Sequence, residues 1–431
     1  MIFKTQNKIT NCIVNKKSSI KLNIIKKMYN EIINISNNIS NSIDNITKLN
    51  TKNLYEKKTS VNDGLVFHLK NAIFNSTHEK TTSYLNINKQ SNISRQAYEN
   101  RSLLYGHNEL KIINDNLFIN NLNKNTDKES INFIDGTNIN IYDKQNKNGY
   151  RNINILGLTN NNNNSFLFTN QLEGVNKSEI KLFYNLIDLN TFEKNEIIVV
   201  DRCYFSNKFV NTCNKKDIKF IARIKLNSTA LHKFNDYLNN KNKKFNYNPF
   251  DYNCKYHNKN IRIITFKSNN DYIHLASNIK NKKKNIDYFK NKYGNRWNVE
   301  IFFKHIKKNS SIDKITSHKL KTIDNIILSS SINQIIIDRI LSVYNELNDD
   351  ENKKINISNF YDLYADKLIY KIINKKILEN EFINLIILAV SFYKSKIDKT
   401  KSVIRYAIMP YYKWHYKIIS NLNKKVEDKI D

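Results

Sequence analysis

The sequence predicts an α/β protein in which a mixed sheet is flanked by helices. Three stretches lead to this class. Apolar residues alternate over 131–141, a continuous apolar run occupies 196–200, and residues 293–307 have a helical pattern. Alternation is typical of a half-buried strand, and a short continuous run is typical of a strand covered on both faces. At 431 residues the chain is long enough for two or three domains.

Composition favours a polyanionic partner. Lys and Arg number 70 against 39 acids, which gives a net charge of +31 and a pI near 9.7. Nucleic acid is the first candidate and a membrane surface the second. Only 7 Gly and 2 Pro stand beside abundant Asn, Lys and Ile, as expected of an AT-rich coding sequence, so codon usage explains part of the lysine excess.

Cysteine spacing and hydropathy exclude several classes. Cys12, Cys203, Cys213 and Cys254 form no CxxC pair and no zinc-ligand spacing, so free thiols in a reducing compartment are expected. The sequence shows no signal peptide, and the apolar run 382–393 is too short to span a bilayer. These features predict a soluble intracellular protein without a membrane partner.

The N-terminal third is expected to be helical where it is ordered. Residues 1–60 are polar and of low complexity, and 20–46 would form one or two amphipathic helices or stay disordered. A further helix is predicted from Asp63. The segment 94–101 begins with an N-cap candidate and carries Arg95 and Arg101.

Strands are predicted next. Apolar alternation around Asp135-Gly136 predicts strand, turn and strand over 130–143, since an Asp-Gly pair is usually a hairpin turn. Residues 150–168 give further strands, with the Asn run 160–164 as a turn. The apolar run 196–200 ends at Asp201, and an acid at a strand tip is a frequent site geometry in open α/β sheets. Alternatively, Asp201 caps a helix that continues through Phe209.

A strand is expected at 219–224, and residues 227–278 are expected to form turns plus strands at 261–266 and 272–276. The pattern over 323–343 predicts a strongly apolar helix. Residues 346–431 are expected to be mostly helical, with 382–393 as a buried core helix.

The helix expected at 293–307 would carry its polar residues on one face. At about 100° per residue, Tyr293, Arg296, Glu300 and Lys307 lie within an arc of roughly 60°. The residues that would dock on the core lie opposite, at Val299, Phe302 and Ile306. A surface helix can carry such charges by chance, so this pattern needs support from elsewhere in the chain.

That support comes from a resemblance. The spacing Tyr293-x2-Arg296-x3-Glu300-x6-Lys307 resembles the signature of DDE transposases of the IS4 type. The similarity runs from about residue 90 to about residue 340. Asp135-Gly136-Thr137 is similar to the context of the family's first catalytic Asp.

The second Asp segment also matches. Asp201-Arg202-x-Tyr204, followed by Phe-Ile-Ala-Arg at 220–223, resembles the family's second Asp segment in the expected order. One departure is Cys203, because the family usually has Gly there. If this position needs a positive φ, Cys would be strained.

The resemblance implies an RNase H-like mixed sheet interrupted by a β-rich insertion, with helical regions at both ends. It also implies that segment 94–101 resembles the second helix of a helix-turn-helix module, although a plain solvated helix is an equal alternative. The expected divisions are a helical N-terminal region that is a possible DNA-binding module (1–110), the first part of the catalytic domain (111–226), the insertion (227–283), the second part (284–345) and a helical C-terminal region (346–431).

The implied chemistry is metal-dependent cleavage and transfer of DNA strands. Asp135, Asp201 and Glu300 would be the catalytic carboxylates and would hold two Mg²⁺ ions, with Mn²⁺ as a substitute. Water would nick the element's end, and the released 3′-hydroxyl would attack a second phosphodiester. The residues expected to contact DNA are Tyr293, Arg296, Lys307, Arg202 and Arg223. A salt bridge between Arg296 and Glu300 is the competing role, but it would oppose metal binding, so phosphate contact is favoured.

The implied partners are double-stranded DNA, as element ends and target, and a second copy of the chain in a homodimer. The protein would act with DNA inside the cell, in a bacterial cytoplasm, a host nucleus or a viral factory. One alternative is an inactive or domesticated transposase-derived DNA-binding protein. Another is a generic nucleic-acid coating protein, which would leave the acid spacing unexplained.

Some family members stack a flipped base on a Trp of the insertion. Trp297 and Trp414 both lie outside that segment, so a hairpin pathway is not assumed; Phe250, Tyr252 or Tyr256 could stack instead.

Overall fold

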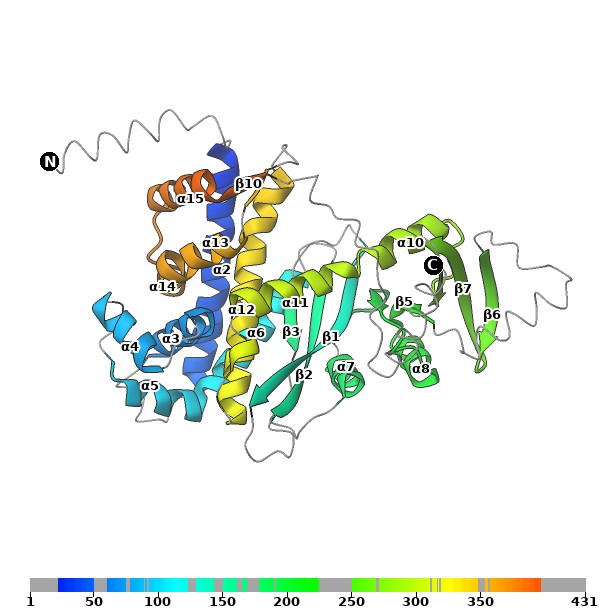
Figure 1. Ribbon diagram of the computed structural model, residues 1–431, viewed down its shortest axis with the longest axis horizontal. Coiled ribbons are helices and arrows are strands. Elements are labelled where there is room, and N and C mark those ends of the chain that lie inside the picture. Colours follow the sequence, from blue (N-terminus) through cyan, green and yellow to red (C-terminus); the bar gives the residue numbers. More distant parts are fainter. Residues whose placement is uncertain are drawn as a thin grey trace, which may run out of the picture.

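A computed structural model describes two parts of the protein, an eight-stranded sheet and a helical body beside it (Figure 1). Cys12, Trp414 and residues 227–249 of the expected insertion lie outside the described residues. The described residues are 22–396 without 50–59, 75–77, 89, 91–92, 123–128, 143–149, 161–164, 169–177, 190, 225–249, 269–270, 311, 316, 318, 348–352 and 356.

The sheet is mixed, with strand order β3-β2-β1-β4-β5-β8-β7-β6. Strands β1, β4 and β5 run parallel to one another, and the other neighbouring pairs are antiparallel. All four residues of β4 are buried, as the continuous apolar run predicted. The strands are β1 (Ile131–Tyr142), β2 (Tyr150–Asn160), β3 (Ser165–Phe168), β4 (Ile197–Val200), β5 (Lys219–Arg223), β6 (Phe250–Tyr256), β7 (Lys259–Ser268) and β8 (Asp271–Ser277).

Strand β1 corrects the expected strand, turn and strand. Asp135 and Gly136 lie inside one continuous strand and pair with Gly157 and Leu156 of β2. The prediction of a hairpin turn at this pair is wrong. Gly136 and Gly157 instead leave space for side chains of neighbouring helices, as described below.

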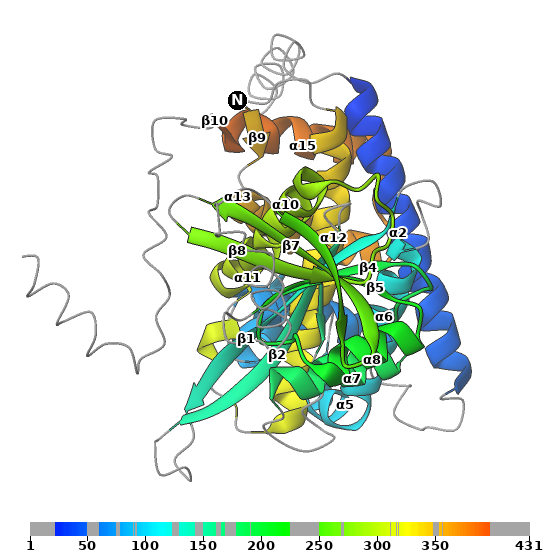
Figure 2. The same cartoon turned by 90° about the vertical axis from the view of Figure 1, so that its right-hand side faces the viewer.

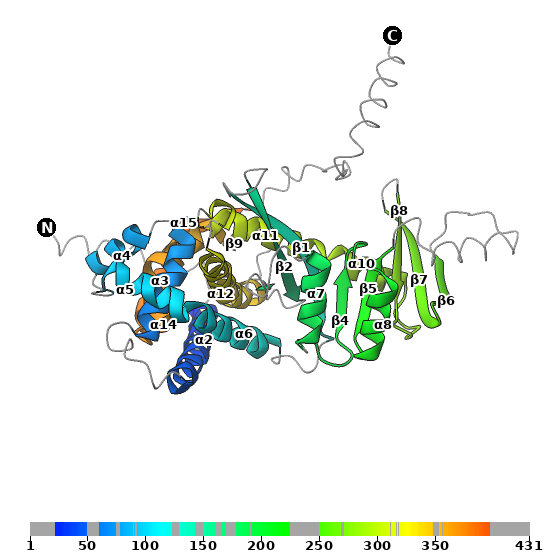
Figure 3. The same cartoon turned by 90° about the horizontal axis from the view of Figure 1, so that it is seen from below.

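Helices cover both faces of the sheet (Figure 3). Phe133 and Val199 face one side and pack with α10, whereas Ile134 and Val200 face the other side and pack with α7 and α8. This alternation follows from the two-residue period of a strand. The helices are α7 (Glu179–Asp188), α8 (Asn207–Lys215), α10 (Ile286–Gly294) and α11 (Trp297–Asn309), followed by the 3-10 turn η3 (Ile312–Lys314).

The strands of the expected insertion extend the same sheet. Strand β8 pairs with β5, and β7 and β6 follow outward. The strands predicted at 261–266 and 272–276 are the cores of β7 and β8, and β6 went unpredicted. Its sequence, Phe-Asp-Tyr-Asn-Cys-Lys-Tyr, alternates but has few aliphatic residues, which weakens the strand signal.

The helical body joins both ends of the described chain (Figures 1 and 2). Helix α2 is one amphipathic helix, so of the two alternatives for 20–46 the ordered one holds. Its buried isoleucines from Ile32 to Ile46 recur three or four residues apart, and the helix packs against α6, α12 and α14. The elements are α2 (Leu22–Leu49), α3 (Val61–Phe74), α4 (His78–Ile87), α5 (Arg95–Arg101), the π-helical turn η2 (Ser102–Gly106), α6 (His107–Leu122), α12 (Leu320–Leu347), α13 (Ile357–Leu363), the π-helical turn η4 (Tyr364–Leu368), α14 (Ile369–Ile373), α15 (Glu379–Tyr393), and the short strands β9 (Lys353–Ile355) and β10 (Lys394–Lys396).

Helix α12 connects the helical body to the sheet. It packs against α2, α3 and α6 on one side and β3 on the other. The segment Leu320–Asn345 is long and apolar enough to cross a membrane, but 78% of its 18-residue apolar window is buried inside the protein. A mostly apolar helix that is largely buried is expected at the centre of a fold of this size.

The fold class predicted from the sequence is confirmed: an α/β protein with a mixed sheet, helices on both faces and helical regions at both ends. The division into five segments stays a prediction.

Candidate active site

The sheet register places two of the predicted acids side by side. Ile134 of β1 pairs with Val200 of β4 in a parallel arrangement. The next residue of each strand is an acid, Asp135 and Asp201, and the two lie close enough for the charge of Asp201 to act on Asp135. Asp201 follows the strand tip and does not cap α8, because Ser206 accepts from Phe209 N at that cap. The prediction of an acid delivered by a central strand is therefore confirmed.

The expected helix over 293–307 is two helices. Helix α10 ends at Gly294, and α11 begins at Trp297. Between them, Arg296 N bonds to Tyr293 O and Val299 N to Arg296 O, each over 3.1 Å and three residues. Gly294 and Asn295 are poor helix formers, which explains the tight turn.

The break separates the four signature residues that were predicted on one face. Tyr293 is the penultimate residue of α10 and is buried, while Glu300 lies in the first turn of α11. Arg296 occupies the turn between them. The predicted apolar face is confirmed, because Val299, Phe302 and Ile306 are buried against β1 and β2.

Arg296 and Tyr293 connect the three predicted acids. Arg296 Nη1 donates to Asp135 Oδ2 over 2.5 Å, and its Nη2 donates to Glu300 Oε1 over 2.8 Å. The Tyr293 hydroxyl donates to Asp201 Oδ1 over 3.3 Å. The three acids come from β1, the end of β4 and α11, and they meet around one arginine and one tyrosine.

The salt bridge to Glu300 reverses an expectation. Phosphate contact was favoured for Arg296 over pairing with this acid, yet the structure contains the pair. Because the guanidinium is partly buried among acids, an ion pair is the available way to satisfy its donors.

Electrostatics in this cluster are dominated by burial and by the excess of acids. Burial raises the pKa of Asp135 to about 6; Arg296 lowers this pKa, and Glu179 and Asp201 raise it. Burial lowers the pKa of Arg296, but Tyr293, Asp135, Asp201 and Glu300 raise it above the ordinary value. Perturbed groups gathered on separate segments are typical of functional sites.

Comparison with known proteins assigns part of the chain to a family. Residues 126–332 match the family model described as "Transposase DDE domain". Residues 126–332 form a DDE transposase domain. No curated protein matches the chain. Among solved structures, the chain is similar to the piggyBac transposase in a cryo-EM synaptic complex with hairpin DNA, at 11% identity and a TM-score of 0.42, with 85% of each chain covered.

Lys307 of the DDE transposase domain does not contact the three acids. Its Nζ donates to the carbonyl of Asn138 over 3.2 Å and lies 3.8 Å from Asp313. Helix α11 thereby carries Lys307 to β1 three residues beyond Asp135.

The other predicted DNA contacts lie at the ends of central strands. Arg202 lies in the turn after β4 and is partly buried. Arg223 ends β5, where its charge acts on Tyr293. Burial raises the pKa of Tyr293 to about 12, and Arg296 and Arg223 partly oppose this rise.

Cys203 is not strained. The non-glycine residues with positive φ in the described part of the chain are Asn195, Asp217, His257, Asn258 and Lys375. Cys203 has an ordinary backbone, so the transposase domain does not need Gly here. Burial raises the pKa of the Cys203 thiol, and the nearby acids, first among them Glu179, raise it further.

Glu179 is an acid of the site that sequence reasoning missed. It is the first residue of α7 and receives hydrogen bonds from the Tyr204 hydroxyl and, over 3.7 Å, from Cys203 Sγ. Two signals could have located its helix. Ser178 is an N-cap residue type, and Leu182, Phe183, Leu186 and Ile187 follow at helical spacing.

Gly157 brings α11 close to the sheet. It pairs with Asp135, and a Cβ placed on it would lie 2.5 Å from the Phe303 ring. Only Gly permits this approach, which places the first turn of α11 and Glu300 near Asp135.

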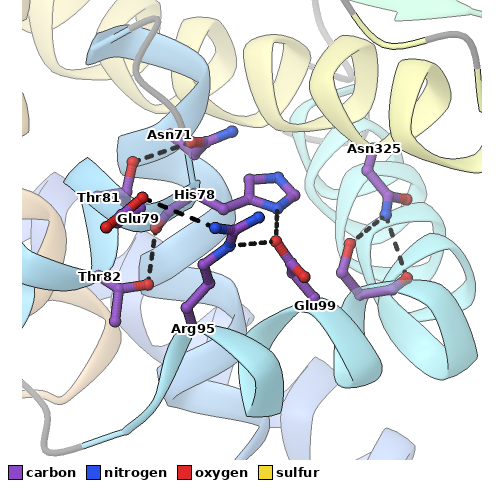
Figure 4. A network of polar contacts seen from close by, with 9 residues as sticks. Asn71, His78, Glu79, Thr81, Thr82, Arg95, Glu99 and Asn325 are labelled. Atoms are coloured by element: carbon purple, nitrogen blue, oxygen red, sulfur yellow. Dashed lines mark hydrogen bonds and ion pairs between the residues drawn. The ribbon is translucent and has the colours of Figure 1, made fainter.

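The segment 94–101, which resembles a recognition helix, lies in a network of ion pairs. Arg95 donates to Glu99 over 2.7 Å and lies 3.7 Å from Glu79, with His78 beside Glu99 (Figure 4). Arg101 is buried and pairs with Glu109, so it does not lie on an exposed face of the helix. Helix α5 runs through η2 into α6, and this makes the segment part of the helical body. DNA binding by the N-terminal region stays a prediction.

The base-stacking candidates also differ in position. Tyr256 is buried and packs on Phe205 with ring centroids 5.2 Å apart, whereas Tyr252 is partly exposed.

The three acids have the ligand chemistry that a hard divalent cation requires. Asp135, Asp201 and Glu300 offer carboxylate oxygens, the ligands that Mg²⁺ prefers. Within the described residues, however, no three acidic, His or Cys side chains stand ready to hold a metal ion together. Arg296 lies between Asp135 and Glu300 and provides the positive charge that these buried carboxylates require.

Proposed function

We propose that this chain is a DNA transposase of the IS4 type that cuts and joins DNA ends at a centre formed by Asp135, Asp201 and Glu300. The observation that carries the proposal is the linkage of these three acids through Arg296 and Tyr293. The acids are far apart in sequence, and a nuclease centre requires such residues to meet at one point. A surface helix charged by chance would bring no distant acid to Glu300.

The three acids would hold two Mg²⁺ ions, or Mn²⁺ in their place, and the bound ions would activate water and stabilise charge on the reacting phosphate. Arg296 would have to release one of its two carboxylates before both acids were available. A released guanidinium stays inside the site, where it can donate to a phosphate as a planar fork. The Tyr293 hydroxyl holds Asp201 in one orientation.

The proposed DNA contacts are Tyr293, Arg296, Lys307, Arg202 and Arg223. The net charge of +31 supports a double-stranded DNA partner inside the cell. We further propose that two copies of the chain act together, each holding one DNA end.

The exposed face of α11 is a further argument for a DNA strand bound beside the acids. Trp297 is 56% exposed and Ile301 is 42% exposed, and Lys304 and Lys308 continue the same stripe at helical spacing. An exposed ring followed by cations suits a nucleic acid strand, since bases stack on rings and phosphates pair with lysines.

The test uses supercoiled plasmid that carries the DNA flanking the coding sequence on both sides. Asp135→Ala, Asp201→Ala and Glu300→Gln are each expected to abolish Mg²⁺-dependent cleavage and strand transfer. Binding of the same DNA, measured by fluorescence anisotropy, is expected to stay within about threefold, because phosphate contacts supply most of the affinity. Cleavage by any of these variants at the wild-type rate would refute the assignment.

A second candidate is a transposase-derived DNA-binding protein that has lost catalysis. The Arg296 bridge favours it, because a guanidinium that never leaves Asp135 and Glu300 would exclude metal ions. Calorimetric titration of the wild-type protein with Mn²⁺ separates the two. Heat of binding that disappears in Asp135→Ala supports the enzyme, and its absence from wild type supports the binding protein.

A further inference from the structure

Glu179 touches both chain segments that carry the first two acids. Helix α7 presents it to β1 beside Asp135 and to the turn after β4 that begins at Asp201. We propose that Glu179 is a positioning residue that fixes Asp135 and Asp201 relative to each other. The inference rests on the proposed function, since it assigns a role within the same site.

The contact with β1 is steric. A Cβ placed on Gly136 would lie 2.1 Å from Cδ and 2.5 Å from Oε2 of Glu179. The carboxyl group therefore lies directly on the backbone of β1, one residue after Asp135. Gly136 has no positive φ, so it is required here for space and not for backbone conformation.

The contact with the turn after β4 consists of hydrogen bonds. The Tyr204 hydroxyl and the Cys203 thiol both donate to Oε1 of Glu179. Tyr204 N bonds to Asp201 O over 3.2 Å, which closes the turn that begins at the acid. A bond to a carboxylate is stronger than one between neutral groups, so Glu179 holds this turn firmly.

The Tyr204 ring is fixed as well as its hydroxyl. It is 1% exposed and packs edge-on against Phe183 of α7, with ring centroids 5.1 Å apart. Helix α7 thus holds the turn through both an apolar and a polar contact. Because Oε1 receives two donors and Oε2 lies against Gly136, Glu179 acts through Tyr204 and β1 and not on the reacting atoms.

The consequence concerns metal affinity. Loss of a group that orients a metal ligand typically lowers metal affinity by about 10–100-fold. Loss of the Glu179 contact should loosen Asp201 relative to Asp135 and weaken metal binding. The maximal cleavage rate should fall less, because all three ligands remain.

The test measures Mn²⁺ affinity by calorimetry and the Mg²⁺ dependence of plasmid cleavage in the full-length protein. Glu179→Ala and Tyr204→Phe are each expected to weaken Mn²⁺ binding about tenfold and to raise the half-saturating Mg²⁺ concentration similarly. The double variant should be little worse than either single variant, because both substitutions remove the same hydrogen bond between Tyr204 and Glu179. Tyr184→Phe is the control: it removes a hydroxyl of the same helix, but that hydroxyl contacts Ser206 and not Glu179. Its Mn²⁺ affinity should match that of wild type.

Two further variants protect the result against simple unfolding. Glu179→Gln keeps an acceptor oxygen and should restore part of the affinity lost in Glu179→Ala. Gly136→Ala should displace Glu179 and mimic its loss, yet add little in the Glu179→Ala background, where the clash is gone.

Wild-type metal affinity in Tyr204→Phe together with reduced affinity in Glu179→Ala would overturn the positioning role and make Glu179 a direct ligand. Wild-type affinity in both variants would overturn the inference while leaving the proposed function intact. Absence of Mn²⁺ binding and cleavage in the wild-type protein would instead refute the proposed function.

Discussion

Two arginines of this protein, Arg101 and Arg296, differ in the balance of charge around them. In the helical body, Arg101 bonds to Glu109 over 2.5 Å, and both side chains are at most 7% exposed. In the transposase domain, Arg296 bonds to Asp135 and Glu300 and also lies in the field of Asp201. The first contact pairs one cation with one anion, whereas the second places one cation among three acids.

The difference separates structural from functional charge. A buried pair of opposite charges is balanced in charge, and removing one partner leaves the other charge uncompensated. A cluster with excess acid costs folding free energy, and such a cost is typically maintained where the site needs it. The predictions below test this distinction, from the largest expected effect to the smallest.

Asp135→Asn should reduce cleavage by more than about 1000-fold, or roughly 4 kcal/mol of transition-state stabilisation. The same variant should keep or gain stability at neutral pH. Burial first of all raises the folded pKa of Asp135 from 3.8 to about 6, so its stabilising contribution is present below pH 3.8 and is lost as pH rises through 6.

At pH 7 the ionised side chain therefore costs up to about 3 kcal/mol. Urea unfolding of wild type and Asp135→Asn at about pH 4 and about pH 7.5 measures this cost, and the stability difference between them should favour the variant more at the higher pH. A variant that is less stable at pH 7.5 would place Asp135 among the structural charges.

Arg101→Met should have the opposite effect to Asp135→Asn: a large loss of stability with no loss of cleavage per folded molecule. It leaves Glu109 buried without this partner, and breaking a buried pair costs about 3–5 kcal/mol. The measurement is the free energy of unfolding in urea. Arg101→Met combined with Glu109→Leu should recover most of that loss, and cleavage per folded molecule should be unchanged in both. Reduced cleavage in the folded double variant would link this pair to the site.

Gly157→Ala tests the packing that brings α11 to Asp135. The added methyl group would overlap the Phe303 ring, and such overpacking costs about 1–3 kcal/mol. Cleavage should fall up to about 100-fold, because a small shift of Glu300 misaligns the site. Phe303→Leu in the same chain should restore part of both losses. Equal activity of Gly157→Ala and wild type would show that α11 tolerates this displacement.

The features that could be predicted from the sequence are those set by residues close together in the chain. The apolar run 197–200 is buried on both faces whatever surrounds it, so its identity as a central strand and the placement of Asp201 at its tip could be predicted. The isoleucine spacing of α2 indicated an amphipathic helix but left disorder open, because the segment is of low complexity; the structure forms one helix of 28 residues.

The errors arose where a local pattern has two physical causes. Asp135-Gly136 is a frequent turn, but here Gly136 gives space to Glu179, a residue 43 positions later in the chain. The pattern from Tyr293 to Lys307 was assigned to one helix, although Gly294 and Asn295 allow a break that only the packing of α10 and α11 on the sheet decides.

The sequence predicted which acids to examine, and the structure brings these three together, but their contacts were not predicted. The signature spacing pointed to Glu300 and the two Asp segments pointed to Asp135 and Asp201, but neither contains information on which cation an acid meets. The bridge from Arg296 to two carboxylates depends on the turn between α10 and α11, and Glu179 depends on a helix start that a weak N-cap signal did not reveal.

Lys307→Ala should have the smallest effect. Its ion pair with Asp313 is partly exposed, so its loss should cost at most about 1 kcal/mol of stability. If Lys307 contacts a phosphate, as proposed, DNA affinity should fall a few-fold, and the slope of log affinity against log salt should become shallower by about 0.9. Lys111→Ala, which removes a comparable lysine paired with Asp115 in the helical body, should leave that slope unchanged. An unchanged slope in Lys307→Ala would assign this lysine to the group of structural charges, since its remaining role would be to tie α11 to the carbonyl of Asn138.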